Sequence, residues 1–455
     1  MIETEEGSDH PVEVRSVDEL EATFHEGGRP RAEWKIGIEY EKPVVDRRNG
    51  QSVAYDSEPG IRRVLETMLE NSAWRGIYEG DHLIALEDGS ASITLEPGGQ
   101  LEMSGRLCDS LHCADQELRD HVRELLAVGE QLGVSFLGLG IAPKTPISSY
   151  PWMPKARYGV MRHVMQTKGT LGHRMMQQTA TVQSNFDYTD EADALRKFRL
   201  SMALSPIFVA VSANSPVVDG RPSGYRSFRA HTWTDTDNDR CGILPFAFET
   251  DALFRSYTEY ALDVPMYFIE RNSTLLPLRG VTFRRFLHEG YESHRATIED
   301  WRLHLTTLFP EVRLKTYIEL RSADSQPVDL MLGTPALAKG LLYDDDCLEA
   351  AWGVVASWPI AERLHLNEDA AKEGLRAQAG RFRLRDYAAE LISIAREGLK
   401  RQAVCNAEGE DETIFLDRLQ EEIAAGFCPA DRLIERWEGI WGGDVDQLIA
   451  YSAYH

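Results

Sequence analysis

The chain has few cysteines. There are six among 455 residues, and no two of them form a C-x-x-C pair. Structural zinc sites and thioredoxin-like redox sites usually depend on such pairs, and small disulfide-stabilised domains are far richer in cysteine. We therefore expect six reduced thiols. A chain of this length can bury about three quarters of its unfolded surface, so its core needs no covalent or metal support.

Long apolar runs and excess positive charge are also missing. No stretch reaches the ~18 residues of a membrane-spanning helix, and MIETEEGSDHPVEV at the start has neither the basic nor the apolar segment of a secretory signal. Lys and Arg number 49 against 73 Asp and Glu, which gives a formal net charge of −24. Nucleic-acid binding depends on a basic surface. We expect a cytoplasmic protein with no nucleic acid or membrane as partner.

Several catalytic motifs are absent. The chain has no G-x-x-x-x-G-K-[ST], no H-E-x-x-H and no G-x-S-x-G, so a P-loop, a zinc protease site and a serine hydrolase site have no support. FLGLGIAP at 136–143 resembles part of a dinucleotide fingerprint, but Pro143 replaces its third glycine. DTDND at 235–239 begins like a calcium loop, but Arg240 replaces the required glycine and Phe246 the bidentate glutamate.

The order of apolar patterns predicts an α+β fold. Strand-like segments mix with pairs of helices instead of repeating as βαβ units, which favours an antiparallel sheet. The predicted helices lie near 61–73, 110–132, 156–179 and 191–212, and the chain is mainly helical after 340. We divide the chain into three parts: an acidic N-terminal segment (1–30), a core (31–345) and a helical C-terminal region packed on that core (346–455).

Two segments leave alternatives open. In the acidic segment, VDELEATFHEG has the pattern of a helix capped by Ser16, but a solvated segment is the favoured interpretation. The stretch 213–242 is rich in turn residues and predicts a long loop or an irregular hairpin. Its arginines either pair with the neighbouring aspartates, or one of them binds a substrate carboxylate through two parallel hydrogen bonds.

Four strand-like segments have polar faces of an unusual kind. In KIGIEYEK, Glu39 and Glu41 point to one side while isoleucines and a tyrosine point to the other. In ITLEPGGQLEMSG, the turn Pro-Gly-Gly predicts a hairpin that brings Glu96 and Glu102 together. TATVQSNFDY places Gln183 on a face with other polar residues.

The fourth segment, VRLKTYIELRSAD, is predicted to form one continuous strand. Its polar face carries Lys315, Glu319 and Arg321. A solvated face of an open antiparallel sheet alternates in the same way, but these four faces concentrate Glu with Gln, Arg and Lys. Clustered carboxylates need cations, and oxygen ligands without His or Cys favour Mg²⁺ or Mn²⁺. With Arg and Lys to bind phosphate, the pattern predicts a nucleotide-phosphate site on the sheet.

The chain resembles the plant-type glutamate–cysteine ligases, a family also found in bacteria. The resemblance covers roughly residues 34–350 and is carried by blocks such as IGIEYEK, ITLEPGGQLEMSG, GTLGHRMMQQTATVQSNFDY, HTWTDTDNDRCGILPF and HLTTLFPEVRLK. It implies a fold related to glutamine synthetase and the guanidino kinases, in which an antiparallel sheet curves into a funnel covered by helices.

The resemblance also implies a reaction. ATP phosphorylates the γ-carboxylate of L-glutamate, and the amine of L-cysteine displaces phosphate to give γ-glutamylcysteine, the first step towards glutathione or a related thiol. Mg²⁺ is the expected cofactor, with Mn²⁺ as a substitute. Two alternatives remain open: a γ-glutamyl ligase with another amine acceptor, and a catalytically silent ligand-binding homologue. We expect a monomer or a homodimer.

Site residues follow from the same resemblance, position by position. The implied metal ligands are Glu39, Glu41, Glu96, Glu102, Gln183 and Glu319. The implied catalytic residues are Glu39, Glu41, Glu102, Glu319 and Arg321, with Lys315 and Arg321 on the ATP phosphates. The implied substrate-binding residues are Arg229 for the glutamate α-carboxylate, Trp233 beside it, Gln183, and Tyr158 on the amine-acceptor side.

No cysteine is expected to be catalytic, because acyl phosphate chemistry needs no protein nucleophile. The two positions of the plant regulatory disulfide correspond, in an ungapped comparison, to Asp115 and Gly333, so we expect no disulfide to control activity. Cys108 and Cys113, five residues apart near a helix start, remain able to pair.

Overall fold

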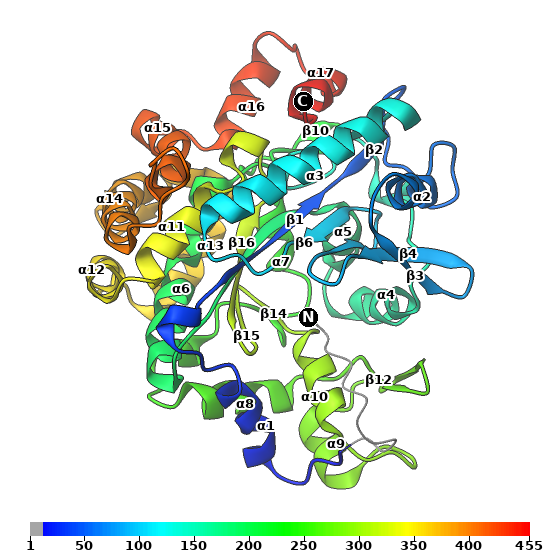
Figure 1. The fold of residues 1–455 in the computed structure, drawn as a ribbon, viewed down its shortest axis with the longest axis vertical. Helices are drawn as coiled ribbons and strands as arrows, with labels where there is room; N and C mark the ends of the chain where they lie inside the picture. The colour runs from blue at the N-terminus through cyan, green and yellow to red at the C-terminus, as the bar shows by residue number, and fades with distance from the viewer. Residues whose placement is uncertain (1–11) are drawn as a thin grey trace.

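An eight-stranded antiparallel sheet forms the centre of the computed structural model, which describes residues 12–455 (Figure 1). In spatial order its strands are β15 (Val312–Leu314), β16 (Ile318–Asp324), β8 (Thr181–Phe186), β1 (Ile36–Lys42), β6 (Leu101–Ser104), β5 (Ser92–Leu95), β4 (His82–Glu87) and β3 (Arg75–Glu79). Every neighbouring pair in this sheet is antiparallel. The predicted α+β fold with an antiparallel sheet is confirmed.

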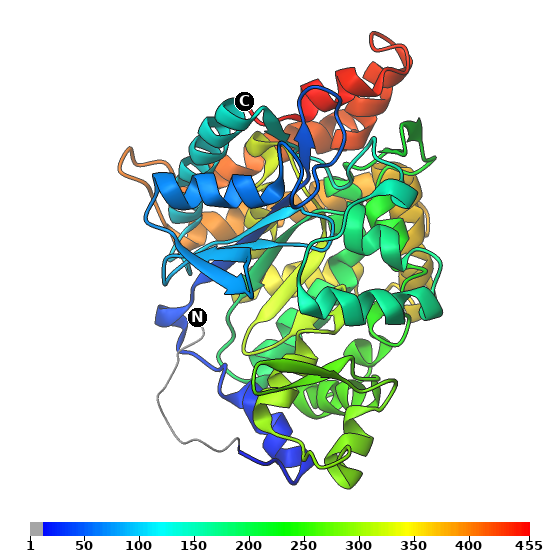
Figure 2. The ribbon, with the colours of Figure 1, turned by 90° about the vertical axis from the view of Figure 1, so that its right-hand side faces the viewer.

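Helices cover this sheet and extend the molecule at both ends. Those before residue 310 are α1 (Val17–His25), α2 (Ile61–Asn71), α3 (Leu111–Leu132), α4 (Ala156–Lys168), α5 (Gly172–Gln178), α6 (Glu191–Ser212), α7 (Phe228–Trp233), α8 (Leu253–Asp263), α9 (Phe283–Glu289) and α10 (Ile298–Leu305). Those after it are α11 (Gly333–Leu342), α12 (Asp345–Val355), α13 (Ile360–Glu373), α14 (Leu384–Gln402), α15 (Asp417–Ala425), α16 (Pro429–Glu438) and α17 (Val445–Ser452). In both views α1 and α16 lie at opposite ends of the molecule (Figures 1 and 2).

Short strands form five further pairs. They are β2 (Val44–Asp46) with β7 (Val134–Phe136), β9 (Val217–Val218) with β10 (Arg221–Pro222), β11 (Cys241–Gly242) with β14 (Phe309–Pro310), β12 (Phe268–Arg271) with β13 (Thr274–Pro277), and β17 (Gln378–Ala379) with β18 (Phe382–Arg383). No helix within residues 12–455 has the length and apolar character needed to span a bilayer.

The alternating sequence of strand β1 places apolar side chains on one face of the sheet and glutamates on the other. Ile36, Ile38 and Tyr40 are no more than 2% exposed, and Lys42 on the same face contacts His121 of α3. This face is therefore buried under α3, and the intervening Glu39 and Glu41 point to the other side of the sheet. The apolar half of the pattern anchors the strand, and the polar half is left for a site.

Two predicted elements are divided in the structure. The segment 312–324 is a hairpin and not one strand, because the Lys315 N–H bonds the Tyr317 carbonyl (2.8 Å) and Leu314 faces Ile318. The predicted helix 156–179 breaks into α4 and α5 at Gly169, where a Cβ atom would lie 2.1 Å from the Asp235 carbonyl oxygen. Both corrections arise from contacts that a periodic pattern does not contain.

The favoured interpretation of the N-terminal segment as solvated is wrong for its second half. Helix α1 forms there, and Ser16 caps it by accepting a bond from the Glu19 N–H (3.3 Å). Leu20 and Phe24 are 0% and 1% exposed, because α1 packs on α8. Residues 1–11 of the segment lie outside the described residues.

The C-terminal helices pack on the rest of the chain. Helix α13 contacts α6, and α14 contacts α6 and α11. The main hydrophobic cluster runs from Val14 to Tyr454 and draws on residues from both sides of position 345. The three-part division of the chain stays a prediction.

One disulfide contradicts the expectation of six reduced thiols. Cys108 and Cys113 are bonded, with 5.7 Å between their Cα atoms, a normal separation for a bridge. The backbone of Cys108 pairs with Ile36 at the start of β1, and Cys113 lies in the first turn of α3. Their spacing allowed this pairing, but only the fold of the loop between them decides it. Cys241, Cys347 and Cys428 are buried free thiols, and Cys405 is exposed.

Candidate active site

The polar face of the central sheet forms a wall of a cavity of about 280 Å³. Four of the predicted glutamates line it: Glu39, Glu41, Glu96 and Glu102. Gln183, Arg229, Trp233, Tyr158 and Arg321 line it as well. The structure therefore brings together, around one cavity, most of the residues that the sequence singled out. Lys315 and Glu319 do not line it.

Sheet register explains why these side chains meet. Glu41 lies directly opposite Glu102 of β6, and Glu39 opposite Gln183 of β8. Directly opposed residues of an antiparallel pair project to the same side. Thr94 of β5 also faces Glu102 and donates to its carboxylate (2.8 Å). Four neighbouring strands, β8, β1, β6 and β5, thus present one continuous polar surface.

The turn between β5 and β6 is held against α5. The Gly99 N–H bonds the Glu96 carbonyl (2.9 Å), and the Gly98 N–H bonds the side chain of Gln100 (2.9 Å). Gln100 in turn donates to the Thr179 carbonyl (2.7 Å). A Cβ atom on Gly98 would lie 2.0 Å from the Gln177 carbonyl oxygen, so this close approach requires glycine. The turn sets the positions of Glu96 and Glu102 on its two sides.

The acidic cluster is electrostatically unfavourable in the absence of a cation. Burial, followed by repulsion from Glu319 and Glu102, raises the pKa of Glu39 to about 7. Burial and repulsion from Glu96 and Glu102 raise the pKa of Glu41 well above its usual range. The pKa of Glu102 is raised too, by burial and by Glu96, with which it shares a hydrogen bond.

These carboxylates suit a hard divalent cation in chemistry and charge. They offer only oxygen donors, they share one face, and burial together with their mutual repulsion raises their pKa values, which a bound cation would oppose. Within residues 12–455, no group of three or more His, Cys, Asp or Glu side chains is preassembled at metal-binding distances. Binding would have to draw the glutamate side chains together.

Glu319 lies behind the cavity wall and bonds three cations. Arg313 donates to both of its carboxylate oxygens (3.0 and 2.6 Å), Arg321 donates to one of them (2.5 Å), and Lys315 lies 3.2 Å away. Burial acts to raise the pKa of Glu319, but the three cations outweigh it and hold this pKa well below its usual range. The side chain is fully buried.

Cations of the cavity include three that the sequence analysis missed. Arg313, Lys155 and Arg157 line it together with the expected arginines. Arg313 was overlooked although it alternates in step with Lys315, Glu319 and Arg321 and so belongs to the same polar face. The hairpin places it directly opposite Glu319. Lys155 and Arg157 directly precede the predicted Tyr158 in the segment MPKARYGVMRHVM (153–165), and their charge was a usable signal.

Arg229 and Trp233 lie on α7, a short helix within the predicted loop. Ser227 caps this helix by accepting a bond from the Ala230 N–H (2.9 Å). Arg229 is 3% exposed and donates to the carbonyls of Ser322 (3.3 Å) and Arg321 (2.8 Å) on β16. The guanidinium is therefore fixed at the cavity wall. Of the proposed ion pairs inside the loop, Arg240 with Asp237 is present (2.7 Å).

Gln183 and Tyr158 are tied to the wall as well. The Gln183 amide links two predicted site residues, since it donates to Glu41 (3.5 Å) and its oxygen accepts from Arg321. The buried Tyr158 hydroxyl donates to the Leu95 carbonyl, next to Lys155, whose ammonium donates to the same oxygen (3.2 Å).

Comparison with known proteins identifies the family. The profile described as Glutamate-cysteine ligase family 2 (GCS2) matches residues 35–451. This chain belongs to that family. A relative from Brassica juncea, named "Glutamate--cysteine ligase, chloroplastic", is 40% identical over 446 residues, which cover 97% of this chain and 85% of the relative. The "Glutamate--cysteine ligase B, chloroplastic" of Oryza sativa subsp. japonica is also 40% identical, over 97% of this chain and 88% of the relative.

Membership of this glutamate–cysteine ligase family makes the chain an enzyme, a ligase, and confirms the resemblance drawn from the sequence. Among solved structures, a glutamate–cysteine ligase from Francisella tularensis in complex with AMP superposes with a TM-score of 0.54 at 14% identity, over 92% of this chain and 88% of that one. That likeness supports the fold.

The expected cytoplasmic location is contradicted by these relatives. The matching glutamate–cysteine ligases from Brassica juncea, Arabidopsis thaliana and Nicotiana tabacum are all named chloroplastic. The prediction rested on a low cysteine density and on the absence of a secretory signal, and neither property distinguishes between the compartments of a cell. We withdraw it.

Proposed function

We propose that this enzyme joins the γ-carboxylate of L-glutamate to the amine of L-cysteine at the expense of ATP, with Mg²⁺ as cofactor. The observation that carries the proposal is the cavity wall itself, where four glutamates face a set of lysine and arginine side chains. Such a site can hold a polyphosphate with its counter-cations beside a carboxylate substrate. Family membership and the names of the relatives support this reaction.

Glu41, Glu96 and Glu102 are the residues we propose as the main cation ligands, with Glu39 beside them. Mg²⁺, or Mn²⁺ in its place, would neutralise the charge of the ATP phosphates and of the transferring phosphoryl group. Glu39 also accepts a bond from the Asn185 amide (3.0 Å), which fixes its orientation. Gln183, between Glu41 and Arg321, completes this wall.

Glu319 has a different part in the proposal from the one that the family resemblance implied. Because its oxygens already bond three cations, we propose that it orients Arg313 and Arg321. Lys315 contributes charge from the same cluster. The two arginines line the cavity and are placed to bind phosphate oxygens.

The proposed chemistry has two steps. First, an oxygen of the glutamate γ-carboxylate attacks the γ-phosphorus of ATP, the bond to the bridging oxygen breaks, and ADP leaves. The arginines and Lys155 oppose the negative charge on the phosphoryl oxygens. Second, the cysteine amine attacks the acyl carbon of γ-glutamyl phosphate, inorganic phosphate leaves, and the nitrogen loses its proton. The protein acts chiefly by positioning the reactants and by balancing charge.

Arg229 is the proposed ligand of the glutamate α-carboxylate, with Trp233 on the same helix beside it. Tyr158 and Lys155 lie on the side of the cavity formed by the start of α4, which we assign to the amine acceptor. The buried tyrosine hydroxyl is already bonded to Leu95, so the ring, and not the hydroxyl, would contact the acceptor.

The decisive experiment is ATP turnover by the pure protein with L-glutamate and Mg²⁺, with and without L-cysteine. We expect phosphate release that depends on both amino acids, and γ-glutamylcysteine as product. Faster turnover with another amine from a panel would assign a different acceptor. No turnover with any amine, together with measurable binding of ATP or glutamate, would identify a silent homologue.

A further inference from the structure

A buried carboxylate lies directly behind Arg229. Asp324, at the end of β16, is 1% exposed, and its Oδ1 lies 3.9 Å from Nη1 of Arg229. This distance is within the range of electrostatic attraction but too long for a hydrogen bond. Arg229 and Asp324 therefore attract each other without using up the donors of the guanidinium.

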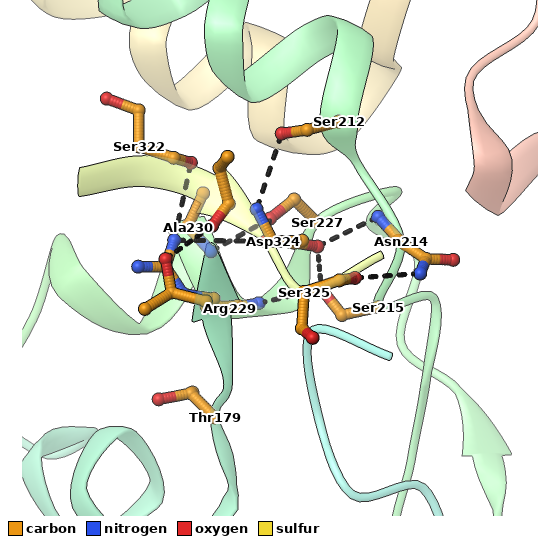
Figure 3. A network of polar contacts seen from close by, with 12 residues as sticks. Thr179, Ser212, Asn214, Ser215, Ser227, Arg229, Ala230, Ser322, Asp324 and Ser325 are labelled. Atoms are coloured by element: carbon orange, nitrogen blue, oxygen red, sulfur yellow. Dashed lines mark hydrogen bonds and ion pairs between the residues drawn. The ribbon is translucent and has the colours of Figure 1, made fainter. Parts of the chain in front are cut away.

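Both oxygens of Asp324 are bonded to other groups (Figure 3). Oδ2 accepts from the Asn214 N–H (2.8 Å) and from the Ser215 hydroxyl (2.6 Å), and Oδ1 accepts from the Ser227 hydroxyl (2.7 Å). The same serines connect to α7. Ser215 accepts the backbone N–H of Arg229 (3.1 Å), and Ser227 is the cap of that helix.

We propose that Asp324 is a positioning residue for Arg229, and that Ser215 and Ser227 keep its carboxylate from forming a direct bidentate pair with the arginine. The inference rests on the proposed function, in which Arg229 binds the substrate α-carboxylate. A free aspartate at this distance would compete with that carboxylate for the guanidinium donors. Held by the serines, it supplies balancing charge and fixes α7 while donors of Arg229 stay available.

The glycines of FLGLGIAP serve this arrangement. A Cβ atom on Gly140 would lie 2.4 Å from Cγ of Asp324, and one on Gly138 would lie 2.6 Å from the Gln326 carbonyl oxygen. The end of β16 and the residues after it can pack against this segment only because Gly138 and Gly140 lack a side chain. This motif, which fails as a dinucleotide fingerprint, makes room for the carboxylate behind Arg229.

The test compares Asp324→Asn with wild type in steady-state kinetics and in calorimetric binding of L-glutamate. Loss of the charge behind Arg229 should raise the glutamate KM about 10-fold or more, because the buried guanidinium loses the electrostatic attraction that holds it and α7 in place. The KM for ATP should stay near its wild-type value. Equal changes in both KM values, or a change in thermal stability alone, would overturn the inference.

Ser215→Ala provides a second variant that keeps the charge. With one of the two donors to Oδ2 removed, Asp324 is held less firmly and should turn towards Arg229, and the glutamate KM should again rise. In the double variant with Asp324→Asn, the serine substitution should add less than it does alone, because the competing carboxylate is gone and only the bond to the Arg229 N–H is lost. Additive effects of the two substitutions on the glutamate KM would contradict the proposal. This double-mutant comparison remains valid even if one of the single variants is less stable than the wild type.

Asp300→Asn is the matched control. Asp300 is also buried, pairs with an arginine (Arg271, 2.6 Å) and bonds a capping hydroxyl (Thr297, 3.2 Å), but it lies in α10 and does not line the cavity. This variant should lose stability without any selective change in the glutamate KM. Wild-type enzyme that fails to turn over glutamate and ATP would refute the proposed function, whereas an active wild type with an unaffected Asp324→Asn variant would refute only this inference.

Discussion

The glutamates of the cavity wall lie where their charges destabilise the folded protein. Glu41 faces Glu102 across a strand pair, and Glu102 shares a hydrogen bond with Glu96. Burial and mutual repulsion raise the pKa values of Glu41 and Glu102, so the ionised cluster is held in a state that the fold itself disfavours. Strain of this kind is typical of functional sites.

Replacing Glu102 with Gln should therefore have opposite effects on activity and stability. Turnover should fall by about 100-fold or more, because a charged group that stabilises the transition state through the cation is lost. The Tm of the metal-free protein should rise, because one repelling charge is removed. Steady-state kinetics with Mg²⁺ measures the effect on turnover. Scanning calorimetry in the presence of a chelator measures the effect on the Tm. Near-normal turnover would exclude Glu102 from the site.

The substitution Arg229→Lys tests whether Arg229 binds the α-carboxylate of L-glutamate. Lysine keeps the charge but lacks the planar pair of donors, so the glutamate KM should rise about 10-fold while the KM for ATP changes little. Steady-state kinetics with each substrate varied in turn gives the two values. An equal effect on both substrates, or none on either, would make Arg229 a structural residue that only anchors α7 to β16.

Among the elements, the β5–β6 hairpin shows how backbone contacts place the chemistry. Its turn touches α5 so closely that only Gly98 fits, and Gln100 ties the same turn to the Thr179 carbonyl. The two glutamates on its sides depend on this contact for their position. Helix α5 thus positions the glutamates through its backbone and also lines the cavity with Met175 and Met176.

Gly98→Ala should disturb both stability and activity. The added methyl group meets a backbone carbonyl, which cannot move without α5, so the free energy of unfolding should fall by about 1–3 kcal/mol. Turnover should fall as well, because Glu96 and Glu102 shift. Gly159→Ala is the control, because Gly159 lies in α4 and a Cβ atom there would meet nothing within 4 Å. Alanine at this position should leave the free energy of unfolding unchanged or raise it by up to about 1 kcal/mol. Full activity of Gly98→Ala would show that the site tolerates movement of the hairpin.

At the scale of the whole molecule, the Cys108–Cys113 bridge connects the loop before α3 to the first turn of that helix. It closes a short loop, so it removes less entropy from the unfolded chain than a bridge between distant segments would. Neither cysteine lines the cavity. The bridge is thus placed to stabilise the junction of β1 and α3, and not to take part in the reaction.

Cys113→Ala, which prevents the bridge, should lower the free energy of unfolding by about 2 kcal/mol. Turnover should stay near that of the wild type, before and after treatment with a reductant. Denaturant titrations and activity assays of both proteins under the two conditions provide the comparison. A large and reversible loss of wild-type activity on reduction would show that the bridge maintains the active form.

Patterns within the sequence were sufficient to predict the antiparallel α+β fold and the polar faces of the central strands, and with the family resemblance they pointed to nine of the residues that line the cavity. The reason is that side chains alternate between the two faces of a strand with a period of two, and that a turn such as Pro97–Gly99 is recognised from adjacent residues. The chemistry of Glu39, Glu41, Glu96 and Glu102 follows from residue type alone.

The pairing of particular cations with particular carboxylates depends on the three-dimensional fold. The hairpin at 315–317 brings Arg313 to Glu319, and the end of β16 carries Asp324 to Arg229, 95 positions away along the chain. The disulfide, the break at Gly169 and the docking of α1 on α8 have the same origin. The break at Gly169, the Asp324–Arg229 pair and the docking of α1 depend on segments that are distant in sequence, whereas the hairpin and the disulfide depend on the fold of a short loop. Neither kind of contact leaves a periodic signal in the sequence.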